Sequence, residues 1–284
     1  MTRARLRIAL ALAVLCAVPP VVLSPVLHLF LFHPRADEAP EVEAIGERVA
    51  YAADDGTRLS SWWVPAVGER RRTVVYFHGN GATASDCAAW AAHLSRRGSD
   101  VLLAEYRGYG RSEGSPSARG VELDGDAALR FVRDARGVPE RESVVHGQSL
   151  GGAVATHVLS GVGASVAGGV LESTFSSLHD MARAMFGVAL TRVVPDAYAL
   201  DSAARAPNVR TRILQIHGDA DEVIPYALGE ALHRRLPEGA RFVRIAGGTH
   251  NLFDEASERA IDARRTLRVR AESPSGSPIR WWRR

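Results

Sequence analysis

The sequence predicts an α/β fold with a mostly parallel, eight-stranded sheet and helices on both faces. Two observations carry this prediction. From residue 73 onward, short apolar runs alternate with longer helical segments, a pattern typical of parallel strands joined by right-handed crossovers. The runs are apolar at nearly every position, as strands covered on both faces require. A length of 284 residues allows one large domain of this kind or two small ones.

Each expected element follows from its own pattern. Two runs separated by Asp54-Asp55-Gly56 predict a hairpin formed by strands 48–51 and 59–64. The other strands are expected at 73–77, 100–105, 143–146, 166–171, 212–216 and 241–245. Helices are expected at 84–97, 118–136, 153–159, 226–236 and 253–269.

Residues 175–208 interrupt the alternation, and two interpretations remain open. The segment combines apolar residues such as Met181 and Met185 with Pro195 and Pro207. We expect a short helical excursion over the carboxyl edge of the sheet, and the alternative is an ordinary crossover helix. The segment is too short for a large cap domain.

Composition excludes several function classes. Apolar residues make up 46% of the chain, which excludes wholesale disorder. The net charge is only +3 and the basic residues, all arginines, are spread through the chain except at its termini, so no nucleic-acid partner is predicted. Cys16 and Cys87 are too few for a disulfide framework or a zinc site, and we expect unpaired buried thiols.

Residues 8–32 are apolar apart from Ser24 and His28, and two interpretations compete for them. A cleaved signal peptide needs a shorter apolar run and a small-x-small cleavage site, and neither is present. The run is long enough to span a membrane, so we expect an uncleaved anchor with a single pass. Arginines precede the run and acidic residues follow it. The positive-inside rule then places the globular domain on the extracytoplasmic, periplasmic side.

These features divide the chain into four expected parts: a membrane anchor at 1–33, a linker at 34–45, an α/β domain at 46–269 and a disordered basic tail at 270–284. The tail ends in Ile279-Arg-Trp-Trp-Arg-Arg284. Two interpretations remain open. The tryptophans and arginines of this ending could rest on an anionic membrane surface, or the tail is solvated and has no role.

The pattern Gly147-Gln-Ser-Leu-Gly151 falls between an expected strand and an expected helix. Glycines are needed two residues either side of Ser149 because a strained strand-to-helix turn leaves no room for side chains there. The following helix directs its N-terminal amides toward the serine. Ser149 is therefore the candidate nucleophile, and it needs a general base because a hydroxyl is a poor nucleophile at neutral pH.

His250, in the loop after strand 241–245, is the candidate base. The carboxyl ends of parallel strands converge on one rim, which brings this loop toward Ser149. Three other histidines are weaker candidates: His146 lies inside a strand, and His78 and His217 precede tight glycine turns where packing roles are expected.

The base needs a carboxylate to orient it. Asp221, after strand 212–216, is the favoured acid, and Glu172, at the end of the preceding strand, is its rival. We expect Asp219 to shape the turn and Glu222 to face solvent or cap the next helix.

The tetrahedral intermediate of acyl transfer needs two backbone N–H donors, the oxyanion hole. We expect one from Leu150, directly after the nucleophile. The other is expected from the glycine-rich loop after strand 73–77, with Asn80 favoured and Gly81 second. This chemistry requires no metal or organic cofactor.

Six motifs between about residues 45 and 265 carry a resemblance to a known family. They are Phe77-His-Gly-Asn-Gly81, Glu105-Tyr-Arg-Gly-Tyr-Gly-Arg-Ser112, His146-Gly-Gln-Ser-Leu-Gly-Gly152, Glu172-Ser-Thr-Phe175, His217-Gly-Asp-Ala-Asp221 and Gly247-Gly-Thr-His250. With them, the chain resembles a serine hydrolase of the α/β-hydrolase superfamily. It is similar to a compact, membrane-anchored branch that includes protein depalmitoylases, and to serine aminopeptidase-like hydrolases.

The resemblance implies an α/β-hydrolase fold with the order nucleophile, acid, histidine. The apolar N-terminal segment ending in Phe32-His33-Pro34 also fits this branch. The chain departs from it at Glu105, where Asp is usual, and at Thr174, where Pro is usual. Neither departure touches the expected triad, but the second is expected to reshape the rim of the pocket.

Together these residues predict a hydrolase that cleaves an ester or thioester through an acyl-enzyme on Ser149. The substrate is expected to be a small or acylated molecule. One alternative is a serine aminopeptidase-like peptidase, which needs an acidic pocket that residues 175–208 supply only with Asp180 and Asp196. The other is a non-catalytic binding protein of the same fold, and such proteins usually lose the nucleophile or the histidine.

Overall fold

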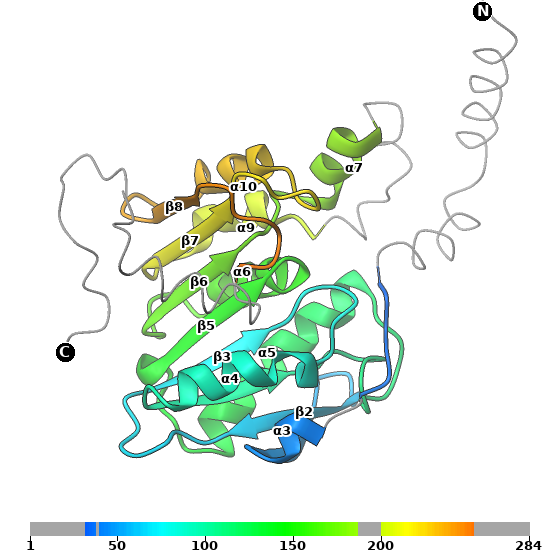
Figure 1. Cartoon of the computed structure of the whole chain (residues 1–284), viewed down its shortest axis with the longest axis vertical. Helices are drawn as coiled ribbons and strands as arrows, with labels where there is room; N and C mark the ends of the chain where they lie inside the picture. Colours follow the sequence, from blue (N-terminus) through cyan, green and yellow to red (C-terminus); the bar gives the residue numbers. More distant parts are fainter. Residues whose placement is uncertain (1–31, 38–39, 187–199, 253–284) are drawn as a thin grey trace, which may run out of the picture.

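The computed structural model describes residues 32–37, 40–186 and 200–252 (Figure 1). The expected anchor up to residue 31, the closing helix at 253–269 and the tail at 270–284 lie outside the described residues, as does Asp196. Within the described residues, no helix combines the length and apolar character that crossing a bilayer demands.

One eight-stranded sheet forms the centre of the molecule, as predicted (Figure 1). Its strand order is β1-β2-β4-β3-β5-β6-β7-β8. The β1–β2 and β2–β4 pairs are antiparallel and all the others are parallel. The strands are β1 (Glu47–Ala52), β2 (Arg58–Val64), β3 (Arg72–Phe77), β4 (Ser99–Ala104), β5 (Ser143–Gln148), β6 (Gly168–Glu172), β7 (Ile213–Gly218) and β8 (Arg241–Ile245).

The strand order reverses direction at β3. From β3 the chain moves to β4 on one side, and then crosses back to place β5 on the other side of β3. At such a reversal, the loops after the two central strands diverge and leave a crevice at the carboxyl edge of the sheet. The loops that follow β3 and β5 carry Asn80 and Ser149.

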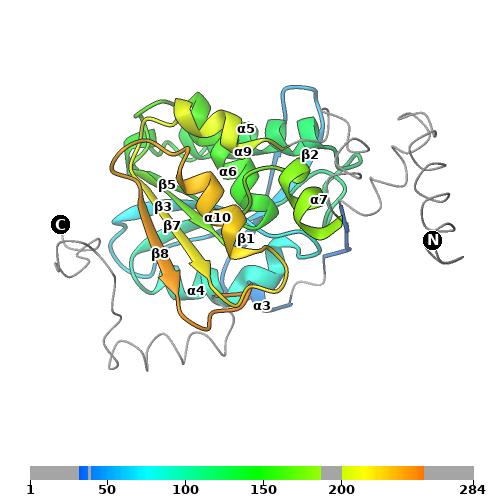
Figure 2. The same cartoon turned by 90° about the horizontal axis from the view of Figure 1, so that it is seen from above.

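Helices cover the two faces of the sheet unequally in the described residues (Figure 2). One face carries α5 (Ala118–Asp134), α6 (Leu150–Gly161), α9 (Ser202–Arg205) and α10 (Tyr226–His233). The other face carries α4 (Ala88–Ser95), preceded by the 3₁₀ turn η1 (Ala84–Cys87), and the short α3 (Pro40–Glu43).

Alternation along β3 explains why both faces are packed. Val75 and Phe77 belong to the larger core with α5 and α6, while Val74 and Tyr76 belong to the core with α4. Consecutive side chains of a strand point to opposite faces, so a strand covered on both sides must be apolar throughout.

The structure places the predicted strands within two residues of their expected bounds, and it revises two other regions. Helix α6 begins at Leu150 rather than at Ala153, because the chain enters the helix directly from Ser149. Residues 175–208 form α7 (Leu178–Phe186), α9 and the 3₁₀ turn η4 (Ala206–Asn208), and residues 187–199 lie outside the described part.

The segment expected to be a linker makes specific contacts with the sheet. Val42, on α3, is fully buried. The Asp37 carboxylate accepts hydrogen bonds from Arg48 and from the Trp62 indole N–H, at 2.8 and 3.2 Å. Phe32, the last residue of the apolar N-terminal segment, is also buried in the larger core.

Candidate active site

Ser149 occupies a sharp turn between β5 and α6. Its φ of 54° and ψ of −117° lie outside the regions that residues with a side chain prefer. A Cβ at Gly147 would lie 2.0 Å from the Gly151 carbonyl oxygen, and a Cβ at Gly151 would lie 2.0 Å from the Phe77 carbonyl oxygen. Glycine at both positions is therefore a steric requirement of the turn and of the contact between α6 and β3.

Three hydrogen bonds hold the strained residue in place. The Ser149 N–H donates to the Glu172 carbonyl oxygen at 2.9 Å. Its own carbonyl oxygen accepts from the Gly152 N–H at 2.9 Å and from the Thr174 hydroxyl at 2.7 Å. Thr174 is fully buried. The threonine thus supplies a donor to the turn that a proline at this position could not supply.

His250 and Asp221 are brought together by the loops after β8 and β7. The His250 Nδ1 atom lies 3.1 and 2.9 Å from the two carboxylate oxygens of Asp221. A carboxylate only accepts, so Nδ1 carries a proton and, in the neutral imidazole, Nε2 has a free lone pair. The Asp221 side chain is fully buried, whereas that of His250 is 12% exposed.

The Asp221 carboxylate also accepts from two groups of its own loop and from one side chain at the end of β7. These donors are the backbone N–H groups of Val223 and Ile224 and the Nε2 atom of His217. Burial by itself raises the pKa of Asp221, but the hydrogen bonds from His217, His250 and Ile224 outweigh it and hold the pKa well below its ordinary value. Asp221 is therefore a carboxylate at neutral pH.

The Ser149 and His250 loops lie side by side at the same edge of the sheet. The Gln148 side chain donates a hydrogen bond to the Asn251 side chain at 3.0 Å, which joins the residues next to Ser149 and His250. Among the described residues no hydrogen bond joins Ser149 Oγ to His250. Catalytic hydrogen bonds are often long in the absence of substrate.

The loop after β3 also approaches Ser149. A Cβ added to Gly79 would lie 3.4 Å from the Ser149 Cβ. The next residue, Asn80, has its side chain bound to Tyr109 and His33. Its backbone N–H has no hydrogen bond to any described residue. Leu150 is the first residue of α6, where helix geometry leaves the N–H without an intrahelical partner.

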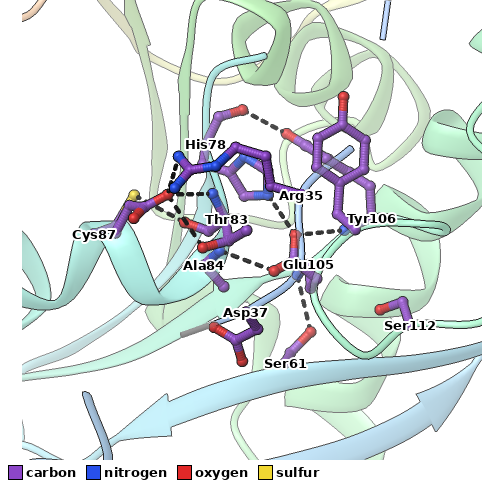
Figure 3. A network of polar contacts seen from close by, with 12 residues as sticks. Arg35, Asp37, Ser61, His78, Thr83, Ala84, Cys87, Glu105, Tyr106 and Ser112 are labelled. Carbon is purple, nitrogen blue, oxygen red and sulfur yellow. Dashed lines mark hydrogen bonds and ion pairs between the residues drawn. The ribbon is translucent and has the colours of Figure 1, made fainter. Parts of the chain in front are cut away.

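A buried pair, His78 and Glu105, holds the base of this loop (Figure 3). His78 Nδ1 lies 2.8 Å from the Gly79 carbonyl oxygen, and Nε2 lies 2.7 Å from a Glu105 carboxylate oxygen. The same carboxylate accepts from the Ala84 N–H at 2.9 Å. Glu105 thus connects both ends of the loop that contains Asn80. The position of Glu105 after a buried apolar strand could have indicated a structural role, but the sequence does not show that His78 and the Ala84 N–H are its partners.

The rival residues have other partners in the structure. Glu172 is paired with His146, at 3.1 Å, rather than with His250. The His217 Nε2 atom lies near the Ile224 carbonyl oxygen as well as near Asp221. The expected turn-forming residue, Asp219, accepts from the Gly247 N–H and from Arg244, so it shapes the loop of the histidine as well as its own. Glu222 is exposed.

A cavity of about 590 Å³ opens beside the site on the α4 face. Its lining includes Gln148 and Asn251, the sequence neighbours of Ser149 and His250, together with Tyr76, Trp90 and Ala88. No group of three or more His, Cys, Asp or Glu side chains in the described part of the chain has the geometry to hold a metal ion.

Comparison with known sequences gives two findings. The profile of the family described as Serine aminopeptidase, S33, matches residues 68–203. The chain is also similar to the YfhR protein of Escherichia coli strain K12, with 32% identity over 233 residues. That alignment covers 78% of this chain and 79% of YfhR.

Solved structures with the same fold include hydrolases. An esterase of Pyrococcus furiosus superposes with a TM-score of 0.64 at 18% identity, covering 84% of this chain and 96% of the esterase. An alpha-beta hydrolase of Vibrio vulnificus also gives a TM-score of 0.64, at 21% identity, covering 79% of this chain and 80% of that protein. At these identities the likeness concerns the fold.

Proposed function

The chain belongs to the α/β-hydrolase superfamily of serine hydrolases, and we propose that it cleaves carboxylic esters or thioesters through an acyl-enzyme formed on Ser149. The observation that carries this proposal is the strained serine at the start of α6, beside a loop in which the Asp221 carboxylate binds His250 Nδ1. This arrangement provides a nucleophile, a base with the required tautomer and a group that orients the base.

In the proposed reaction, His250 Nε2 removes the hydroxyl proton of Ser149 as Oγ attacks the substrate carbonyl carbon. The resulting imidazolium is stabilised by the Asp221 carboxylate. The proton then passes to the leaving alcohol or thiol, and the bond between it and the carbonyl carbon breaks. Water, deprotonated by the same nitrogen, releases the acid and restores Ser149.

The oxyanion of each tetrahedral intermediate would be stabilised by the Leu150 and Asn80 N–H groups. Support for this assignment comes from the proximity of Gly79 to Ser149 and from the absence of a described partner for the Asn80 N–H. Donors fixed in advance at the site of developing charge stabilise a transition state without reorganising during the reaction.

A serine aminopeptidase remains the second candidate, because the matching family carries that description. An aminopeptidase needs an acidic group for the amino terminus of its substrate. In the described part of residues 175–208, Asp180 is the expected candidate, and its carboxylate accepts from the Ser176 hydroxyl at 2.7 Å. Turnover of aminoacyl p-nitroanilides in preference to p-nitrophenyl esters would support the peptidase.

The membrane anchor expected at residues 1–33 is part of the proposal. It would hold the domain on the extracytoplasmic side and would favour lipophilic or acylated substrates, which concentrate at membranes. Support comes from the apolar run and from the distribution of charge around it.

The proposal is tested by labelling the full chain with a fluorophosphonate and by measuring hydrolysis of p-nitrophenyl esters and acyl thioesters of increasing chain length. Ser149→Ala should abolish labelling and lower kcat by at least about 10³-fold. Ser165→Ala, at an exposed serine beyond the end of α6 opposite Ser149, serves as the matched control. Labelling of Ser149→Ala at the parental rate would refute the nucleophile. A folded parent without turnover of any acyl substrate would favour a binding protein.

A further inference from the structure

The first described segment of the chain, residues 32–35, contacts the loop that carries Asn80, the second proposed oxyanion donor. The His33 N–H donates to Asn80 Oδ1 at 2.9 Å and lies 3.1 Å from the Tyr109 hydroxyl oxygen. The Tyr109 hydroxyl in turn donates to Asn80 Oδ1 at 2.8 Å. His33 Nδ1 lies 3.0 Å from Asn80 Nδ2. The Asn80 side chain is therefore bound through both of its polar atoms.

The donors and acceptors in this contact can be assigned. A backbone N–H can only donate, so the Asn80 atom facing it must be the amide oxygen. The Asn80 NH₂ group must then donate to His33 Nδ1, which holds the neutral imidazole of His33 in the tautomer with its proton on Nε2. His33 thus both donates to and accepts from the same side chain.

Other contacts anchor the segment on both sides of His33. Phe32 is buried in the larger core, with 2% of its surface exposed. The Arg35 carbonyl oxygen accepts from the Gly110 N–H at 2.8 Å, and the Arg35 guanidinium contacts the Gly81 carbonyl oxygen at 3.1 Å and Asp86 at 3.3 Å. The segment therefore presents a fixed histidine to a loop that needs support.

The need for support follows from the sequence of the loop. Asn80 lies between Gly79 and Gly81, and Gly81 has a φ of 76°. Glycines restrict the backbone very little, so the direction of the Asn80 N–H depends on contacts made by its side chain and by the base of the loop. Contacts from His33 and Tyr109 fix the side chain, and His78, paired with Glu105, holds the Gly79 carbonyl oxygen, at the other end of the peptide bond that carries the Asn80 N–H.

We propose that His33 is a positioning residue for the hydrolase: through the Asn80 side chain, it aims the Asn80 backbone N–H at the oxyanion. This inference rests on the proposed function. It extends the proposed active site to a residue that precedes the segment matched by the family profile, residues 68–203, whereas Asp221 and His250 follow that segment.

The test compares variants of the full chain in which the side chain of residue 33 places its hydrogen-bond acceptor for the Asn80 NH₂ group at different positions. His33→Asn places an oxygen at the position of Nδ1, whereas His33→Gln places it one atom farther away. His33→Gln and His33→Ala should lower kcat for p-nitrophenyl butyrate and the rate of fluorophosphonate labelling about threefold to tenfold, with KM unchanged. His33→Asn should restore at least half of the loss.

A second arm tests whether the effect passes through Asn80. Asn80→Ala keeps the backbone N–H but removes the side chain that His33 binds. In that background His33→Ala should change kcat less than about 1.5-fold, because coupled residues are not additive. An equal loss in both backgrounds, or a loss that His33→Asn does not restore, would overturn the inference.

The controls separate this inference from the proposed function. His33 is exposed, so the melting temperature of its variants should stay within about 2 °C of the parent. A lower melting temperature with unchanged kcat would mean that His33 stabilises the fold only, and would overturn the inference. If Ser149→Ala is inactive and His33→Gln behaves as the parent, only the role of His33 is refuted. If Ser149→Ala retains activity, the proposed function itself fails.

Discussion

At the scale of single residues, Asp221 shows how a buried charge is stabilised. Its carboxylate is removed from water, yet it accepts from His250, from His217 and from two backbone N–H groups. His217 Nδ1 is buried without a partner among the described groups, which indicates the neutral tautomer with a proton on Nε2. The depressed pKa of Asp221 therefore comes from donors that surround it, and these act only in the folded chain.

This depressed pKa predicts how stability depends on pH. The native state favours the carboxylate, so Asp221 stabilises the fold above its ordinary pKa of 3.8, and the contribution is lost as the pH falls from there through the native pKa. Asp221→Asn should lower the free energy of unfolding most near neutral pH, and the difference from the parent should narrow below pH 3.8. Urea unfolding of both proteins across this range measures the difference.

Asp221→Asn should also lower kcat about 10³- to 10⁴-fold, because the amide of asparagine does not hold His250 in the required tautomer. A stability difference that widens in acid would contradict the assigned donors, and unchanged turnover would contradict the role of Asp221 in the reaction.

At the scale of elements, the turn from β5 to α6 determines the site. Helix α6 can approach β3 only because Gly151 has no side chain against the Phe77 carbonyl oxygen. The close approach places the start of the helix next to the loop that contains Asn80. A single steric condition thus brings both proposed oxyanion donors to the same side of Ser149.

Two glycines of α6 provide a matched test of this condition. Gly151→Ala would place its Cβ 2.0 Å from the Phe77 carbonyl oxygen, so it should destabilise the fold by about 3 kcal/mol and abolish fluorophosphonate labelling. Gly161→Ala lies at the other end of the same helix, where nothing lies within 4 Å of the new methyl group. It should stabilise the fold by about 0.5 kcal/mol and leave labelling unchanged. Similar melting temperatures for the two variants would show that α6 can shift away from β3.

At the scale of the whole molecule, the two ends of the described chain lie on opposite sides of the candidate site. Residues 32–37 lie on the β1–β2 side and the loop with His250 lies on the β8 side. Phe32 enters the larger core and Asp37 binds β1 and β2 through Arg48 and Trp62. The loop after β8, which carries His250, contacts the residue next to Ser149 through the hydrogen bond between Gln148 and Asn251. The site is therefore assembled between segments that are far apart in sequence.

Truncation tests how much of the N-terminal segment the domain needs. A chain that begins at Phe32 should fold, remain in the soluble fraction and react with fluorophosphonate at a rate close to the parent. A chain that lacks residues 1–37 should lose about 2–3 kcal/mol, because Phe32 no longer fills its place in the core. Its labelling should also be slower. Equal melting temperatures and labelling rates for the two truncated chains would contradict a role for residues 32–37.

Much of the fold could be predicted because the patterns are local. Apolar runs predict the parallel strands, and the hairpin turn at Asp54-Asp55-Gly56 predicts the antiparallel pair of β1 and β2. The start of α6 at Leu150 was missed, because helix propensity gives little indication of a helix that begins directly at a strained residue. The packing of residues 32–37 was also not predicted, because Phe32 and His33 end an apolar run that indicates a membrane anchor and residues 34–37 resemble a linker in composition.

The sequence by itself determined which residues are candidates for the proposed hydrolysis: the serine between two glycines, and the acid and histidine that follow it in order. Only the tertiary structure decided how the other polar residues are used. It pairs Glu172 with His146, connects Glu105 to both ends of the Asn80 loop and brings His33 onto Asn80. The physical reason is that hydrogen-bond partners are selected by three-dimensional position, and the crossovers of the sheet bring together strand ends that the sequence keeps far apart.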